Sequence, residues 1–213
     1  RLVPQLANSI RWEPPYQGAQ QSHLYRSSPS VWDQPSNARL MECTSLLARF
    51  YALNQPWNPY FRDPALGRRL SEALEYWLSL QNPEGGFPEY RGFGSNELPA
   101  VSFGLIEMGD IYDAMKGEQL FLKFKSRWID SMKRAVLWAS IEDSPQRKQG
   151  ILYSNQFIGI LFGAWNLYEA TGDESWLSLY VGLSNWWLQN GQTGEGWYIE
   201  GSGREDFSYA NVT

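Results

Sequence analysis

The sequence holds one cysteine, Cys43, and one histidine, His23, among its 213 residues. A single cysteine excludes an internal disulfide, and a single histidine argues against a zinc site built from cysteine and histidine. We therefore expect no metal and no other cofactor. Cys43 follows Leu40 on the apolar side of an expected helix, so we expect it in the core. His23 lies in a proline-rich leader, where a packed or exposed histidine is commoner than a general base.

No apolar run reaches the length of about 18 residues that a membrane-spanning helix needs. The net charge of −5 provides no general basic face for a nucleic acid or an acidic membrane. We therefore expect neither a nucleic-acid partner nor a membrane partner. The chain begins at Arg1 without a visible signal peptide, so we interpret it as trimmed and expect a periplasmic or secreted location after processing.

Aromatic side chains are abundant and make up 15% of the residues, with 11 Trp, 12 Tyr and 10 Phe. Most of them are expected to fill the core, because large apolar rings contribute most when they are buried. Three of them, Trp57, Trp197 and Tyr198, lie in expected loops. Rings in such positions are candidates for stacking on sugars.

The dipeptide Ser-Asn precedes an apolar run at three places, Ser36-Asn37, Ser95-Asn96 and Ser154-Asn155, each separated from the next by 59 residues. A further step of the same length falls close to Ser208-Tyr209-Ala210-Asn211. Each pair is followed by an apolar segment, a turn, a second helical segment and a loop with glycine. This layout indicates an internal repeat of two helices.

Apolar residues at helical spacing predict helices over residues 38–54, 64–81, 97–115, 118–140, 156–170 and 173–190. Segments 97–115 and 156–170 are apolar around most of their circumference and should be buried, whereas 118–140 and 173–190 carry more charge and should cover them. We therefore expect an all-α fold. Residues 36–213 would form an incomplete α/α toroid of three αα-hairpins with short β-like loops, truncated at the start of a fourth hairpin, after an extended proline-rich arm over residues 1–35. Its open arc would be covered by a missing C-terminal part or by self-association.

Two loops between hairpins share one layout, Leu-Gln-Asn, a glycine turn, a glycine followed by an aromatic residue, and then a glutamate. They begin at Leu80 and Leu188 and reach Glu89 and Glu200. Glycine permits the sharp reversal that such a loop needs. We expect Gln81 and Gln189, one in each loop, to bond to backbone at a helix end.

The alternation of inner and outer helices and the phrase GEGWYIEGSGREDFSYAN resemble the α/α-toroid domains of heparinase II/III-type and alginate-type polysaccharide lyases and related carbohydrate-active proteins. The resemblance covers residues 36–213 at the level of the fold and about the last twenty residues at the level of the motif. It implies a carbohydrate substrate in a groove at the N-terminal ends of the inner helices, and β-elimination on a uronic acid. Such lyases usually add a histidine, a tyrosine and a β-sandwich from further along the chain, which this sequence lacks.

Elimination on a uronic acid needs a base, a partner for the sugar carboxylate and an acid for the leaving oxygen. Tyr209 is the candidate base or acid, Asn155 and Asn211 are the candidate carboxylate partners, and Glu200 completes the catalytic candidates. The candidate substrate-binding residues are Trp197, Tyr198, Arg204, Gln156, Asn96, Glu89 and Arg91. The Ser-Asn pairs have a structural interpretation as well, because serine and asparagine are preferred helix N-caps.

Two other classes of function remain open. A glycoside hydrolase would use two loop carboxylates about 5–10 Å apart, chosen from Glu89, Glu97, Glu195, Glu200 and Asp206. A non-catalytic toroid would bind carbohydrate through its aromatic residues or act as a protein scaffold. The placement of these side chains distinguishes the classes, since a shared cleft favours an enzyme or a sugar binder, whereas an arm that plugs the inner-helix starts favours a scaffold.

Overall fold

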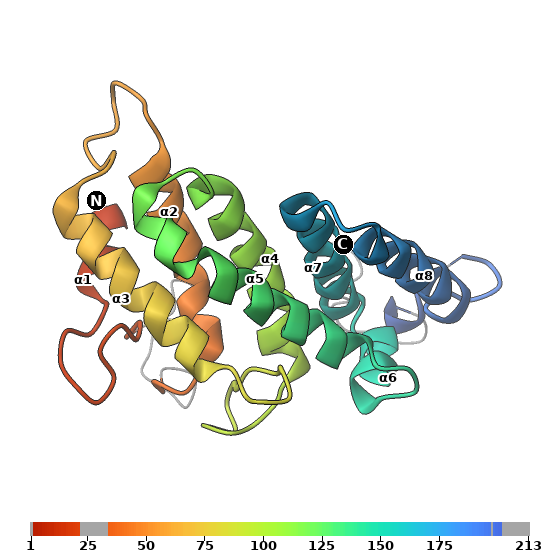
Figure 1. The fold of residues 1–213 in the computed structure, drawn as a ribbon. Helices are drawn as coiled ribbons and strands as arrows, with labels where there is room; N and C mark the ends of the chain where they lie inside the picture. Colours follow the sequence, from red (N-terminus) through yellow and green to blue (C-terminus); the bar gives the residue numbers. More distant parts are fainter. Residues whose placement is uncertain (1, 22–33, 197, 202–213) are drawn as a thin grey trace.

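The computed structural model describes residues 2–21, 34–196 and 198–201 (Figure 1). Its elements are α1 (Leu2–Asn8), the 3₁₀ helix η2 (Ala38–Cys43), α2 (Thr44–Ala52), α3 (Pro64–Leu80), α4 (Leu98–Met115), α5 (Gln119–Ser140), α6 (Pro145–Leu152), α7 (Ser154–Thr171), α8 (Glu174–Asn190) and the 3₁₀ helix η3 (Ile199–Gly201). Over the described ranges there is no strand, only two isolated β-bridges, Ile10–Gln20 and Gln192–Tyr198. The expected all-α class is confirmed, and none of the described helices is long and apolar enough to cross a membrane.

The predicted helices are found close to their expected bounds because their ends carry strong local signals. Asp63 accepts a hydrogen bond of 2.7 Å from the N–H of Leu66, and Pro64 occupies the first turn of α3. Gly172 ends α7 in the left-handed conformation, and Asp173 then caps α8. The segment expected as one helix over 38–54 is instead η2 followed by α2.

Two helices were not predicted from the sequence. The first is α1, so the expectation of an extended arm is wrong for residues 2–8. This helix contacts α2 and α3, and the guanidinium of Arg69 on α3 donates to the carbonyl of Ile10 at 2.7 Å. The second is α6, which begins after Ser144, whose hydroxyl accepts from the N–H of Arg147. The short loop expected between α5 and α7 therefore contains a helix.

Helix α4 lies between α2 and α7, and each of these helices also contacts the helix that follows it, α3 for α2, α5 for α4 and α8 for α7. Figure 1 shows α3 and α5 in front of α2 and α4, with α7 and α8 at one side. Helices α3 and α5 form one layer and α2 and α4 the other. Helix α5 joins the two layers because it contacts α4 and α7 as well as α3. At this junction the buried rings of Trp77 and Trp128 meet edge to face at 5.7 Å, and the Trp128 indole donates to the carbonyl of Met108.

Glycines allow α4 and α7 to approach closely. A Cβ added to Gly159 on α7 would lie 2.4 Å from the carbonyl oxygen of Ser102 on α4, and one on Gly163 would lie 2.8 Å from Leu105. Gly109 on α4 receives the side chain of Asn166 from α7 in the same way. The distance between these two helices is therefore set by the absence of side chains.

We predict that Gly159→Ala lowers the free energy of unfolding by about 1–3 kcal/mol, because the new methyl group overpacks the contact between α4 and α7. The control is Gly182→Ala on α8, where a Cβ meets nothing within 4 Å. That variant should gain about 0.5–1 kcal/mol from helix propensity. Chemical denaturation measures both, and equal shifts in the two variants would contradict the role of Gly159.

Candidate functional site

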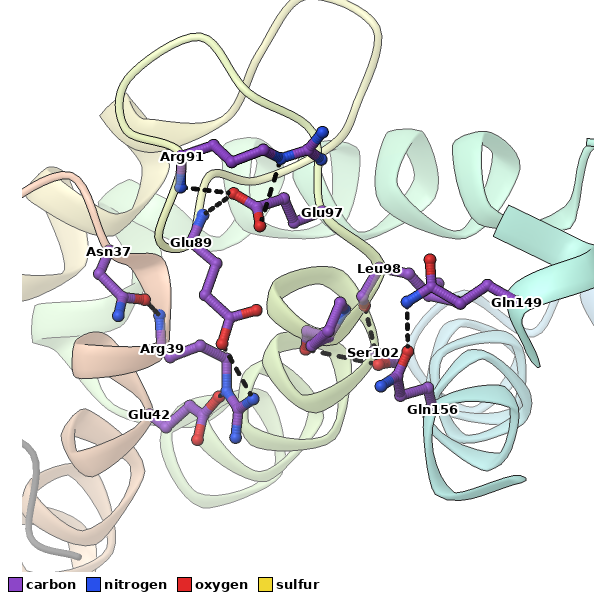
Figure 2. Close-up of polar contacts among 11 residues, drawn as sticks. Asn37, Arg39, Glu42, Glu89, Arg91, Glu97, Leu98, Ser102, Gln149 and Gln156 are labelled. Carbon is purple, nitrogen blue, oxygen red and sulfur yellow. Dashed lines mark hydrogen bonds and ion pairs between the residues drawn. The ribbon is translucent and has the colours of Figure 1, made fainter. Parts of the chain in front are cut away.

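A pocket of about 340 Å³ lies where the N-terminal end of α4 meets α6 and the loop between α3 and α4. It is lined by Tyr90, Arg91, Asn96, Glu97, Leu98, Pro99, Trp138, Pro145, Gln146 and Gln149. It lies at the N-terminal end of α4 and brings together the candidates Arg91 and Asn96. Figure 2 shows the polar contacts around it. None of the described residues of the N-terminal arm lines this pocket.

The loop between α3 and α4 is fixed at its base by amide side chains. Gln81 donates from Nε2 to the carbonyls of Gly85, at 2.9 Å, and Ser131, at 2.8 Å, which confirms its predicted bond to backbone. Asn82 donates to the side-chain oxygen of Asn96 at 2.8 Å. Asn96 also rests against Gly86, where a Cβ would lie 2.1 Å from that oxygen. The candidate Asn96 therefore closes the loop as well as lining the pocket.

Glu97 is a buried carboxylate at the start of α4, with 3% of the residue exposed. One of its oxygens accepts from the N–H of Glu89 at 3.0 Å, the N–H of Arg91 at 3.1 Å and the hydroxyl of Ser95 at 2.9 Å. Its other oxygen lies 3.5 Å from Nε of Arg91. The carboxylate holds the loop against α4, since a buried charge is stable only with such partners.

Glu89 is a second buried carboxylate of the same loop, and it turns toward the start of η2. Its oxygen Oε1 lies 3.6 Å from the guanidinium of Arg39, which also pairs with Glu42 and lies 4.2 Å from the ring centre of Phe103 (Figure 2). Asn37 caps η2 by accepting from the N–H of Arg39 at 2.9 Å. The carboxylate of Glu89 therefore serves an ion pair between the loop and η2.

Glu200 occupies the corresponding place in the loop after α8. It is buried, and one carboxylate oxygen accepts from the N–H of Ser154 at 2.7 Å and from its hydroxyl at 2.6 Å. Ser154 is the first residue of α7 and is held by Glu200, whereas α4 begins at Leu98, after Glu97, whose side chain makes no capping hydrogen bond. The N-cap interpretation of the Ser-Asn pairs is confirmed for Asn37 and is wrong for the other two pairs.

Two amide side chains join α6 to α7. Gln149 donates from Nε2 to Oε1 of the candidate Gln156 at 2.9 Å (Figure 2). The neighbouring candidate Asn155 has a buried side-chain oxygen with no hydrogen-bond partner among the described residues. Tyr198 packs against Trp187 at 5.1 Å between ring centres. These candidates lie at the N-terminal end of α7 or beside α8, and the pocket lining does not include them.

The remaining candidates, Tyr209, Asn211, Arg204 and Trp197, lie outside the described residues, as do Asp206 and His23. Of the loop acids, Glu195 is exposed. Over the described ranges no group of three or more histidine, cysteine, aspartate or glutamate residues could hold a metal ion.

Sequence reasoning missed the pocket residues of α6, Gln146 and Gln149, together with Tyr90 and Trp138. The available signal was Ser144-Pro145, a preferred N-cap followed by a preferred first-turn residue. A helix of eight residues gives too short an apolar pattern to be recognised by periodicity.

No family model, no curated protein and no solved structure matches this chain.

Glu107 is a half-buried carboxyl on α4, ten residues beyond Glu97. Burial raises its pKa, and the nearby charges of Glu42 and Asp110 act in the same direction, while a hydrogen bond from Ser45 opposes them. The folded chain therefore holds the proton of Glu107 more tightly than the unfolded chain does. The resulting stabilisation is fully present below the pKa that Glu107 has in the unfolded chain, and it is lost as the pH rises through the raised pKa of the folded chain.

We predict that Glu107→Gln becomes more stable relative to the wild type as the pH rises from about 4 through this window, because glutamine does not ionise. Urea unfolding at a series of pH values measures the difference in the free energy of unfolding. A difference that stays constant with pH would show that burial does not act on Glu107 as described.

Proposed function

We propose that the described helices are an arc of an α/α toroid of the polysaccharide-lyase type. We further propose that the protein is a carbohydrate-active enzyme that cleaves a uronate-containing polysaccharide by β-elimination. The substrate would lie across the N-terminal ends of α4 and α7. The observation that carries the proposal is the pocket at the start of α4, with its guanidinium and amide side chains.

These side chains suit a sugar carboxylate. Arg91 is 59% exposed at its side chain, and a guanidinium pairs with carboxylates through two parallel hydrogen bonds. Gln146, Gln149 and Asn96 add amide groups that can bond to ring hydroxyls. The volume of about 340 Å³ is at the small end of the range for ligand pockets.

The hydrolase alternative is weaker because three of its five candidate loop carboxylates, Glu89, Glu97 and Glu200, are occupied. Glu97 and Glu200 are buried and accept hydrogen bonds from backbone N–H and serine hydroxyl groups. Glu89 is buried beside Arg39. A general acid must give its proton to the leaving oxygen of the sugar, which these carboxylates cannot approach without releasing their partners. The catalytic candidate Glu200 therefore acts, in this proposal, by holding the start of α7.

In the proposed reaction a base removes the proton beside the sugar carboxylate, hydrogen-bond donors stabilise the enolate, and the glycosidic oxygen at the β-carbon leaves with a proton. Tyr209 is the proposed base or acid, Asn155 and Asn211 the carboxylate partners, and Arg204 a substrate anchor, with Trp197 as a stacking platform. Arg91 is proposed to bind a neighbouring uronate.

A panel of polysaccharides tests the class of function. We expect ultraviolet absorbance of an unsaturated uronide to rise with alginate, heparan sulfate or another uronate polymer. New reducing ends without this absorbance would identify a hydrolase. Binding of a polymer without either product would identify a non-catalytic carbohydrate-binding protein.

We predict that Tyr209→Phe abolishes most turnover on the polymer that the wild type cleaves, because the phenol oxygen that moves the proton is lost. General acid–base groups typically contribute about 10²–10⁴-fold. Full turnover in this variant would remove Tyr209 from the mechanism.

We predict that Arg91→Ala raises KM for the same polymer by about 10–100-fold, because a hydrogen bond to a charged group contributes about 1.5–3 kcal/mol. The control is Arg68→Ala, which removes an exposed arginine from α3, away from the pocket. Equal KM values for the Arg91 variant and the control would exclude Arg91 from substrate binding.

A further inference from the structure

Arg91 projects from a loop with open space around its glycines. Gly92 and Gly94 have φ values of +90° and +83°, and a Cβ on either would meet nothing within 4 Å. Phe93, between them, stacks on Tyr16 with 6.0 Å between the ring centres. The guanidinium of Arg91 is itself held by polar contacts at the base of the loop.

Those contacts converge on Glu97. Its oxygen Oε1 accepts from the N–H groups of Glu89 and Arg91 and from the hydroxyl of Ser95, so a single atom ties together both ends of the loop. Its oxygen Oε2 lies 3.5 Å from Nε of Arg91, and the carbonyl of Asn96 accepts from Nη2 at 2.8 Å. Figure 2 shows both carboxylate oxygens directed at Arg91.

The two sides of this ion pair differ in exposure. The side chain of Glu97 is 2% exposed, whereas that of Arg91 is 59% exposed. Glu97 is fixed at the start of α4, where the backbone N–H of this residue donates to the carbonyl of Phe87 at 2.9 Å. A fixed charge thus holds one edge of the guanidinium and leaves much of the group open to the pocket and solvent.

We propose that Glu97 is the positioning residue for Arg91, and that through Arg91 it sets the preference of the pocket for carboxylated over neutral sugars. This inference rests on the proposed function. Glu97 does not touch the substrate. It holds the guanidinium in place before the sugar binds, so binding removes less conformational entropy from the side chain of Arg91.

Glu97→Gln is the sharpest test because it keeps the shape of the side chain. The amide oxygen can still accept from the loop, but the amide nitrogen faces Nε of Arg91 as a second donor and the negative charge is lost. Ser95→Ala is the matched control. It removes the hydroxyl that lies 2.9 Å from this oxygen and 2.8 Å from the carbonyl of Gly92, and it leaves the charge beside Arg91 unchanged.

KM and kcat are measured on alginate for the wild type, Glu97→Gln, Ser95→Ala, Arg91→Ala and the double variant. Carboxyl-reduced alginate cannot undergo elimination, so its binding to each variant is measured as an inhibition constant against alginate, and the preference is the ratio of that constant to KM. We expect Glu97→Gln to raise KM for alginate about tenfold, with kcat changed less than about threefold, and to reduce the preference over the carboxyl-reduced polymer. Ser95→Ala should keep that preference. In the Arg91→Ala background the Glu97 substitution should add no further change in KM.

An unchanged preference in Glu97→Gln, or an additive effect in the double variant, would overturn the proposal. Thermal unfolding shows whether the variants fold. If Glu97→Gln does not, Glu97→Asp replaces it, and that variant must shift KM in the same direction because the shorter acid withdraws from the guanidinium.

The Nε–H signal of Arg91 in nitrogen-15 NMR separates this inference from the proposed function. A shift of this signal between the wild type and Glu97→Gln, but not Ser95→Ala, supports the positioning role even if alginate is neither cleaved nor bound, in which case the proposed function fails with this polymer. An unchanged signal overturns the positioning role, whatever the activity.

Discussion

The contact between α4 and α7 is the constraint on which the candidate site depends. Gly159 and Gly163 let the two helices approach until the backbone of α7 meets Ser102, and Asn166 fills the space above Gly109. Helix α6 contacts α7, to which Gln149 donates through Gln156, and lines the pocket at the start of α4 with Gln146 and Gln149. A pocket made by ends of different helices requires that their spacing is fixed, and packed interiors fix spacing well.

Buried glutamates then connect the loops to this framework. Glu200 accepts from the N–H at the start of α7, where the positive end of the helix dipole favours a negative charge. Glu97 accepts from N–H groups of the loop before α4, and Glu89 pairs with Arg39 of η2. By these different contacts, acids that the sequence places in loops become parts of the scaffold.

The parts of the fold that sequence predicted are those with local signals. The start of α3 follows from Asp63-Pro64, and the end of α7 from Gly172. The roles of the loop glutamates could not be predicted, because Glu200 and Ser154 are 46 residues apart and meet only after the helices pack. Helix α6 and its side of the pocket were missed for a different reason, since eight residues give little periodicity.

Whether a loop acid can act in catalysis depends on the partners of its carboxylate. An acid in a loop is a candidate catalyst when its carboxylate is open to a ligand, and a structural group when backbone N–H groups already fill its lone pairs. Glu97 belongs to the second kind, and its burial leaves Arg91 as the exposed charge at that edge of the pocket. A surface of guanidinium and amide groups over buried carboxylates binds an anion better than it donates protons. In the function we propose, this arrangement would serve to bind a carboxylated sugar, with proton transfer left to groups beyond the pocket lining.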